Sequence, residues 1–184
     1  MIMKKTYLII SILLVQLLLI SSAQARCNLE LFRFGSSAED IKKQLNLPEG
    51  GMLPIMGGES QNVVFVPGEE VCKDEKAFVG APVTFVFLYD KLVEIQTMRL
   101  SEKPTMIQWA ESIYGEKDKK PKSFYDEKPN AQWLWDNFNA TIAYSIRPDA
   151  NDVVESIIIQ SRRHQSYFEK FAKEEEELLQ GGAQ

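Results

Sequence analysis

A β-hairpin between residues 82 and 100 is the pattern that most restricts how this chain can fold. β-branched and aromatic residues dominate residues 83–89 and 92–98, which flank Asp90-Lys91. Two such runs around a short polar turn are typical of paired antiparallel strands. Asp90-Lys91 lacks the glycine that a tight two-residue turn favours, so a loop one residue longer, and with it another register, stays open. The hairpin needs other elements to cover its apolar residues.

A short helix precedes the hairpin in the first half of the chain. Ser36 and Glu39 have the spacing of a capping box, and Ile41 and Leu45 recur on one helical face. A strand over residues 62–66 is expected next, followed by a polar connection to the hairpin.

The second half repeats this order. Thr105 and Gln108 again have the spacing of a capping box, and Gly115 stands where a helix would end. A lysine-rich linker separates this helix from three predicted strands and a final helix, over residues 132–135, 141–147, 153–160 and 161–180 respectively.

These patterns predict an α+β fold of two repeated helix plus three-stranded antiparallel sheet units, followed by a C-terminal helix. The predicted segments are a cleaved signal peptide (1–25), a first helix-on-sheet unit (26–100) and a second unit with the C-terminal helix (101–184). The order of elements leaves open whether the units form one domain or two, and whether their strands share one sheet.

The N-terminus has the organisation of an export signal. Lys4 and Lys5 precede an apolar run over residues 7–20, and residues 23–25 form a small-x-small cleavage site. A retained membrane anchor is the alternative, but the run is shorter than the roughly 20 residues that span a bilayer. We therefore expect cleavage after Ala25, no transmembrane segment afterwards, and a periplasmic or, alternatively, secreted protein.

Two cysteines remain after cleavage, Cys27 and Cys72. An oxidising compartment would pair them, and the closed loop of about 46 residues would stabilise the fold by about 4 kcal/mol. Free thiols are the alternative, although neither cysteine lies in a C-x-x-C motif. Arg26 precedes Cys27, whereas a lipoprotein needs a small residue there.

The mature chain is acidic. The full sequence has 21 Lys and Arg against 26 Asp and Glu, and losing Lys4 and Lys5 leaves a net charge of −7. Nucleic acids and anionic lipids bind clustered cations, so neither is an expected partner.

No set of residues in the sequence indicates a reaction. His164 is the only histidine and has no apparent partner at catalytic or ligand spacing, which predicts a surface residue. The run Glu174 to Glu177 points around a helix and cannot converge on one ion. We expect no enzyme activity, cofactor or metal; an exported enzyme whose groups meet only on folding is the alternative.

Phe32-Arg33-Phe34-Gly35-Ser36-Ser37, leading into Glu39-Asp40-Ile41, resembles the F-G-M-[ST]-x-x-x-V start of small bacterial periplasmic domains. They include the SmpA/OmlA group of outer-membrane assembly lipoproteins and the tandem β-lactamase inhibitory protein family. The resemblance implies helices against one face of an antiparallel sheet, and binding without chemistry.

Strand pairing predicts which side chains such a sheet would expose. If Tyr89 opposes Leu92, the aliphatic residues Val86, Leu88, Val93 and Ile95 share the face suited to cover by helices. If Trp135 opposes Thr141, residues Leu134, Ile142, Tyr144 and Ile146 face inward. The other face then carries the predicted binding residues Phe85, Phe87, Tyr89, Trp133, Trp135 and Arg147. The alternative is that these rings are core, since a slip of one residue reverses every assignment.

A second candidate contact is an apolar loop between Gly50-Gly51 and Gly57-Gly58. Glycine pairs would let it move, and its methionines adapt to irregular partners, so it could dock onto another protein. Its apolar residues are Met52, Leu53, Ile55 and Met56; packing against the core is the alternative.

Together these features predict an exported protein-binding protein, inhibitor-like or envelope assembly-factor-like, whose partner is another envelope or exported protein. The alternative is an envelope structural protein that self-associates through its C-terminal helix. The sequence indicates neither the partner nor the oligomeric state.

Overall fold

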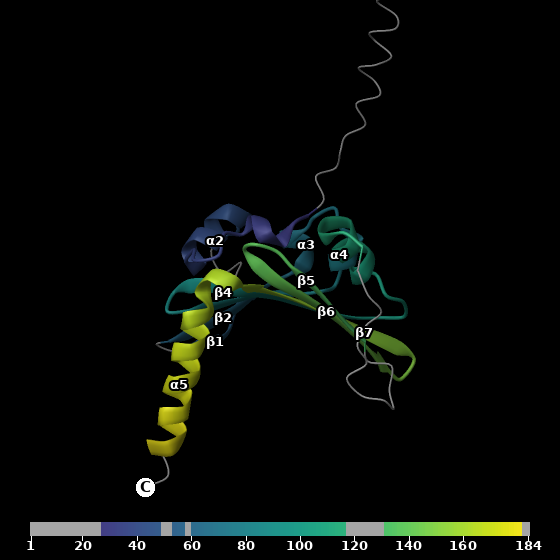
Figure 1. Ribbon diagram of the computed structural model, residues 1–184. Coiled ribbons are helices and arrows are strands. Elements are labelled where there is room, and N and C mark those ends of the chain that lie inside the picture. Colours follow the sequence, from purple (N-terminus) through teal and green to yellow (C-terminus); the bar gives the residue numbers. More distant parts are fainter. Residues whose placement is uncertain (1–26, 49–52, 58–59, 117–130, 182–184) are drawn as a thin grey trace, which may run out of the picture.

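The strands of both halves join in one antiparallel sheet (Figure 1). The computed structural model describes residues 27–48, 53–57, 60–116 and 131–181, so the predicted export signal lies outside the described residues. In sheet order, the seven strands are β1 (Leu53–Gly57), β2 (Gln61–Val66), β3 (Val83–Leu88), β4 (Lys91–Ser101), β7 (Asp152–Ser161), β6 (Ala140–Asp149) and β5 (Ala131–Asp136). The α+β class is confirmed, and the predicted boundary at residues 100 and 101 falls within β4, which pairs with β7.

Short helices cover one face of the sheet, and a longer helix extends from the other (Figure 1). The covering elements are η1 (Leu29–Leu31), α2 (Ala38–Leu45), α3 (Gly68–Val71), η2 (Lys76–Phe78) and α4 (Met106–Tyr114). After β7, η3 (Arg162–His164) leads into the C-terminal helix α5 (Gln165–Gly181). The main core lies between the sheet and the short helices.

Helix α2 begins one residue later than the sequence pattern predicts. The capping box is formed by Ser37 and Asp40, whose side chains accept each other's backbone N–H at 3.2 Å. The Ser37 hydroxyl, which donates to the Asp40 carboxylate at 2.9 Å, and then the Ser37 backbone N–H hold the pKa of Asp40 below its ordinary value. The helix ends at Asn46, which adopts the left-handed conformation that often closes helices.

The β3–β4 hairpin turns one residue earlier than the assumed turn. Leu88 pairs with Lys91, and the two turn residues, Tyr89 and Asp90, both have positive φ, as a type I′ turn requires. The register then shifts between Val86 and Phe87, so that Val86 lies opposite Glu94 and Phe85 lies opposite Ile95. The pairings of Tyr89 with Leu92 and Val86 with Ile95 are therefore wrong.

The β5–β6 hairpin is also displaced by one residue, because its turn is fixed by a side chain. The Asn137 amide oxygen accepts the N–H groups of Asn139 and Ala140, at 2.8 and 2.7 Å. Trp135 consequently pairs with Ile142 rather than Thr141. This shift turns both tryptophans of β5 toward the helices.

A buried carboxylate connects helix α4 to the sheet. Glu155 of β7 has no exposed surface, and its oxygens accept the backbone N–H groups of Thr105, Met106 and Ile107 at 2.7, 2.9 and 3.3 Å. The Tyr144 hydroxyl donates to the same carboxylate at 2.9 Å. The predicted cap by Thr105 is wrong, since its side chain makes no capping bond.

The helix N-terminus and the Tyr144 hydroxyl both stabilise the buried carboxylate of Glu155. A helix N-terminus has unpaired N–H groups and a partial positive charge, so it stabilises an anion. Burial, followed by the adjacent Glu155 carboxylate, raises the pKa of Tyr144, so the phenol stays protonated and donates.

The predicted disulfide between Cys27 and Cys72 is confirmed. It ties the start of the described chain to the residue that ends α3. The Trp109 indole N–H also donates to the Cys27 carbonyl at 2.8 Å, so the bridge adjoins α4.

Replacing Glu155 should destabilise the protein strongly. Glu155→Leu leaves three helix N–H groups and the Tyr144 hydroxyl without their acceptor, so the free energy of unfolding should fall by about 3 kcal/mol. Glu155→Gln, which keeps one acceptor oxygen, should cost less. Urea denaturation measures both, with Glu102→Ala at the exposed strand end as the control; equal effects in Glu155→Leu and the control would contradict this role.

Reducing the disulfide should lower the free energy of unfolding by about 2–4 kcal/mol, because the unfolded chain then loses its closed loop. Denaturation with and without reductant measures the difference. A Cys27→Ala, Cys72→Ala variant should match the reduced protein and be insensitive to reductant, and unchanged stability in both would refute the prediction.

Candidate binding surface

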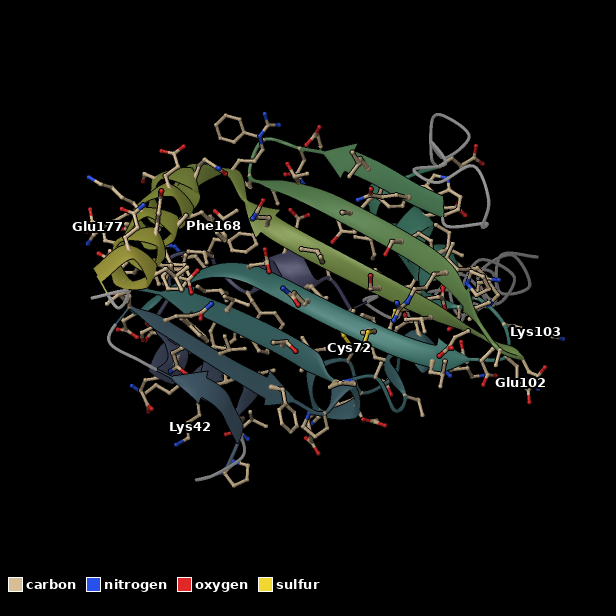
Figure 2. The ribbon with its side chains drawn as sticks, turned by 90° about the horizontal axis from the view of Figure 1, so that it is seen from below. Lys42, Cys72, Glu102, Lys103, Phe168 and Glu177 are labelled. Atoms are coloured by element: carbon tan, nitrogen blue, oxygen red, sulfur yellow. A yellow bond between two sulfur atoms is a disulfide. The ribbon has the colours of Figure 1, made fainter. Side chains whose placement is uncertain are left out.

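The uncovered sheet face carries both polar and apolar side chains (Figure 2). Strand alternation and the observed registers place even-numbered β4 residues on this face, next to even-numbered residues of β7 and odd-numbered residues of β6. Four large apolar side chains on it are exposed: Met98 (57%), Leu100 (58%), Leu134 (63%) and Ile158 (37%). We call these four residues the apolar quartet.

Hydrogen bonds between side chains hold the polar residues of this face in place. Glu94 accepts from the amides of Gln96 and Gln160, the latter at 3.2 Å. The hydroxyls of Ser145 and Ser156 lie 2.7 Å apart across β6 and β7. The polar groups thus bond mainly along and between strands, which fixes their positions beside the apolar quartet.

The prediction that Phe85 and Phe87 are exposed is wrong. Both have no exposed surface, and they lie in the core under the short helices. Phe32 packs edge-on against Phe85, with ring centroids 5.2 Å apart. The physical reason is the one-residue difference in register, which sets Phe85 opposite Ile95 and so turns Phe85 and Phe87 toward the helix-covered face.

Trp133 and Trp135 are half-buried on the helix-covered face. Trp133 packs on Tyr144 at 5.3 Å, and Trp135 packs on Tyr114 at 6.0 Å and donates its indole N–H to the Gly115 carbonyl at 3.1 Å. Leu134, expected to face inward, instead belongs to the apolar quartet.

Arg147 is exposed, and its pairing with Val154 places it on the uncovered face. Of the six predicted binding residues, it is the one that is exposed on the face of the apolar quartet. The six residues that strand pairing assigned to one surface are therefore not brought together.

Tyr89 contacts helix α5 rather than a free surface. Val86, Leu88 and Val93 form a second cluster, which Tyr167, Phe168 and Phe171 of the helix cover. The Lys170 ammonium lies 3.9 Å from the Tyr89 ring centre, a cation–π contact. α5 thus covers one end of an otherwise open face.

A carboxylate completes this attachment. The Ser60 hydroxyl donates to Glu174 at 2.8 Å, and this bond, followed by the nearby Tyr89 hydroxyl, lowers the pKa of Glu174. Burial and the same carboxylate raise the pKa of Tyr89. One of the four consecutive glutamates therefore binds the sheet end instead of lying free in solvent.

His164, the last residue of η3 before α5, is half-buried, which corrects the expectation of a surface residue. Its Nδ1 lies 2.7 Å from the Ser161 hydroxyl, and its ring lies 5.5 Å from that of Tyr167. A Cβ at Gly35 would lie 3.0 Å from its Nε2, so the glycine makes room for the ring. Ser161 is only 1% exposed, so the pair orients the ring and does not present a nucleophile.

The predicted docking loop is largely a strand. Leu53, Ile55 and Met56 belong to β1, which pairs with β2 at the edge of the sheet, while Met52 lies outside the described residues. The first half thus contributes four strands instead of three.

Three further observations bear on the site. Within residues 27–48, 53–57, 60–116 and 131–181, no cluster of three or more His, Cys, Asp or Glu could hold a metal ion. In the same part of the chain, no helix has the length and apolarity needed to cross a membrane. Comparison with protein-family models, curated proteins and solved structures gave no match.

Acidification should weaken the fold through His164. Burial, then the charges of Arg163 and Lys91, lowers its pKa from 6.5, so the folded state favours the neutral ring. The unfolded chain therefore binds more protons, and this contribution to stability, complete above about pH 6.5, is lost as the pH falls toward the lowered pKa.

Denaturation at several values between about pH 7.5 and 5.5 measures the effect, because His164 is the only histidine and no other side chain ordinarily titrates there. His164→Gln should show a smaller pH dependence than the unmodified chain. An equal dependence in both proteins would exclude His164 as its source.

Proposed function

We propose that this chain is an exported protein-binding protein, inhibitor-like or envelope assembly-factor-like, and that its partner contacts the uncovered sheet face. Its compartment is the periplasm, and its partner is another envelope or exported protein. The export signal that the sequence predicts and the disulfide support this location, since disulfides persist in oxidising compartments.

The apolar quartet is the observation that carries the proposal. Met98 and Leu100 lie on β4, Ile158 lies on the adjacent β7, and Leu134 lies beyond it on the edge strand β5. Ala143 of β6 pairs with both Ile158 and Leu134, so a small side chain separates the two larger ones. Four large apolar side chains exposed on one face of a regular sheet favour contact with another macromolecule over contact with water.

The surroundings of the quartet suit a specific contact. Neutral serine, threonine and glutamine side chains lie between the apolar groups and can bond to a partner's polar atoms. Because the Glu94 and Ser145–Ser156 hydrogen bonds already order the side chains of this face, these side chains lose little conformational entropy when a partner binds.

Site-specific crosslinking in expressing cells tests the surface. A photoreactive residue at Met98 should give a defined adduct, and Ile158→Glu on the same face should reduce it about tenfold by introducing a desolvated charge. The matched control is Leu31, an apolar residue of η1 that is 69% exposed on the helix-covered side. Equal adducts from both positions, or none from Met98, would contradict the proposal.

A further inference from the structure

The two edges of the sheet differ in how well they are protected against pairing. β1 contains a proline, Pro54, and its register with β2 is interrupted next to it. Proline and irregular pairing both discourage the addition of another strand. β5 has neither protection: its ladder with β6 is uninterrupted from Ala131 to Asp136, and it contains no proline or lysine.

The backbone groups of β5 that face outward follow from the register. Asn137 donates its N–H to the Ala140 carbonyl at 3.0 Å, which fixes the phase of hydrogen bonding in this hairpin. Residues bonded to the neighbouring strand alternate with residues whose N–H and C=O point the other way. Gln132, Leu134 and Asp136 therefore direct their backbone groups away from β6, where the described sheet has no further strand.

The sequence of β5 is chemically symmetric about Leu134. A tryptophan lies on each side of it, and a polar residue lies beyond each tryptophan, giving Gln132-Trp133-Leu134-Trp135-Asp136. A strand of this kind is complementary to a second copy of itself in antiparallel orientation, as the identical patches of a two-fold dimer must be.

We propose that two copies of this chain associate through β5, with Leu134 of one copy opposite Leu134 of the other. This register joins all the outward backbone groups of both strands. It places each Gln132 amide opposite an Asp136 carboxylate, and each Trp133 opposite a Trp135. The result is a continuous sheet that crosses the two-fold axis.

Other registers of the same pairing are less favourable. Moving the axis to Asp136 sets two carboxylates opposite each other, and like charges in opposed positions destabilise a sheet. Moving the axis by one residue, to Trp133 or Trp135, sets Leu134 opposite Gln132 or Asp136. It also leaves outward backbone groups unpaired. The dimer goes beyond the proposed function because it uses the edge of the sheet, whereas the partner is assigned to its face.

A cysteine at the axis tests this arrangement directly. Directly opposed residues of a bonded antiparallel pair have Cα atoms about 5.5 Å apart, which suits a disulfide. The described cysteines are already paired, so Leu134→Cys should form a crosslinked dimer under mild oxidation. Leu100→Cys, similarly exposed on an interior strand, is the matched control and should remain uncrosslinked. Equal crosslinking of both variants would overturn the proposal.

The mass and amide exchange of the purified chain complete the test. Light scattering should give twice the chain mass. Leu134→Lys sets the lysine of one copy opposite the lysine of the other, so it should raise the dimer dissociation constant at least about tenfold. Amide exchange at Leu134 should be slow in the dimer and fast in this variant.

A monomeric native chain would overturn the proposal. Slow amide exchange at Leu134 in such a monomer would mean that another segment of the chain pairs with the edge, and it would not rescue the dimer. A dimer that persists in Leu134→Lys would overturn it as well, and would favour association through α5. Crosslinking from Met98 to a different protein is independent of all these outcomes, so failure of the dimer and failure of the proposed function are distinguishable.

Discussion

The buried carboxylate of Glu155 is the interaction on which the arrangement of the helix layer depends. A single charged group inside the core joins the N-terminus of α4 to the centre of the sheet and orders Tyr144 beneath it. An apolar residue there would leave the helix free to slide along the sheet, whereas a carboxylate accepts the N–H groups in one position only. Because α4 is fixed, Trp109 can bond to the Cys27 carbonyl and Tyr114 can pack against Trp135 of β5.

The sequence predicts the order of elements well, since that order depends on local patterns. The alternation in residues 83–98, the glycine after α4 and the apolar positions of α5 each involve neighbouring residues. Local capping patterns were less informative: Thr105 has the spacing of a cap, but the acceptor comes from Glu155, far along the chain. A contact between residues so far apart in the chain produces no local sequence pattern.

The sequence pattern misplaces one strand of each hairpin for a related reason. Each hairpin differs from the assumed pairing by about one residue, and the side-chain period of a strand is two, so inside and outside are exchanged for β3 and β5, whereas β6 and β4 from Glu94 onward lie as expected. In β3–β4, the decisive feature is a turn that places Tyr89 in the left-handed region, a conformation uncommon for a bulky residue. In β5–β6, it is the Asn137 side chain. Of the apolar quartet, Leu134 is the residue whose face depends on one of these turns, so it could be placed only once the β5–β6 turn was known.

Helix α5 extends beyond the sheet end to which it is attached (Figure 1). Its first turns pack through Phe168 and Phe171, whereas Leu178 and Leu179 near its end are 76% and 79% exposed. Short helices are marginal in water without tertiary packing, so the last turns depend mainly on local pairs such as Lys173–Glu177. The C-terminus is therefore a natural point for fusing a tag or tether, because sequence appended there would leave the packing of the sheet unaltered.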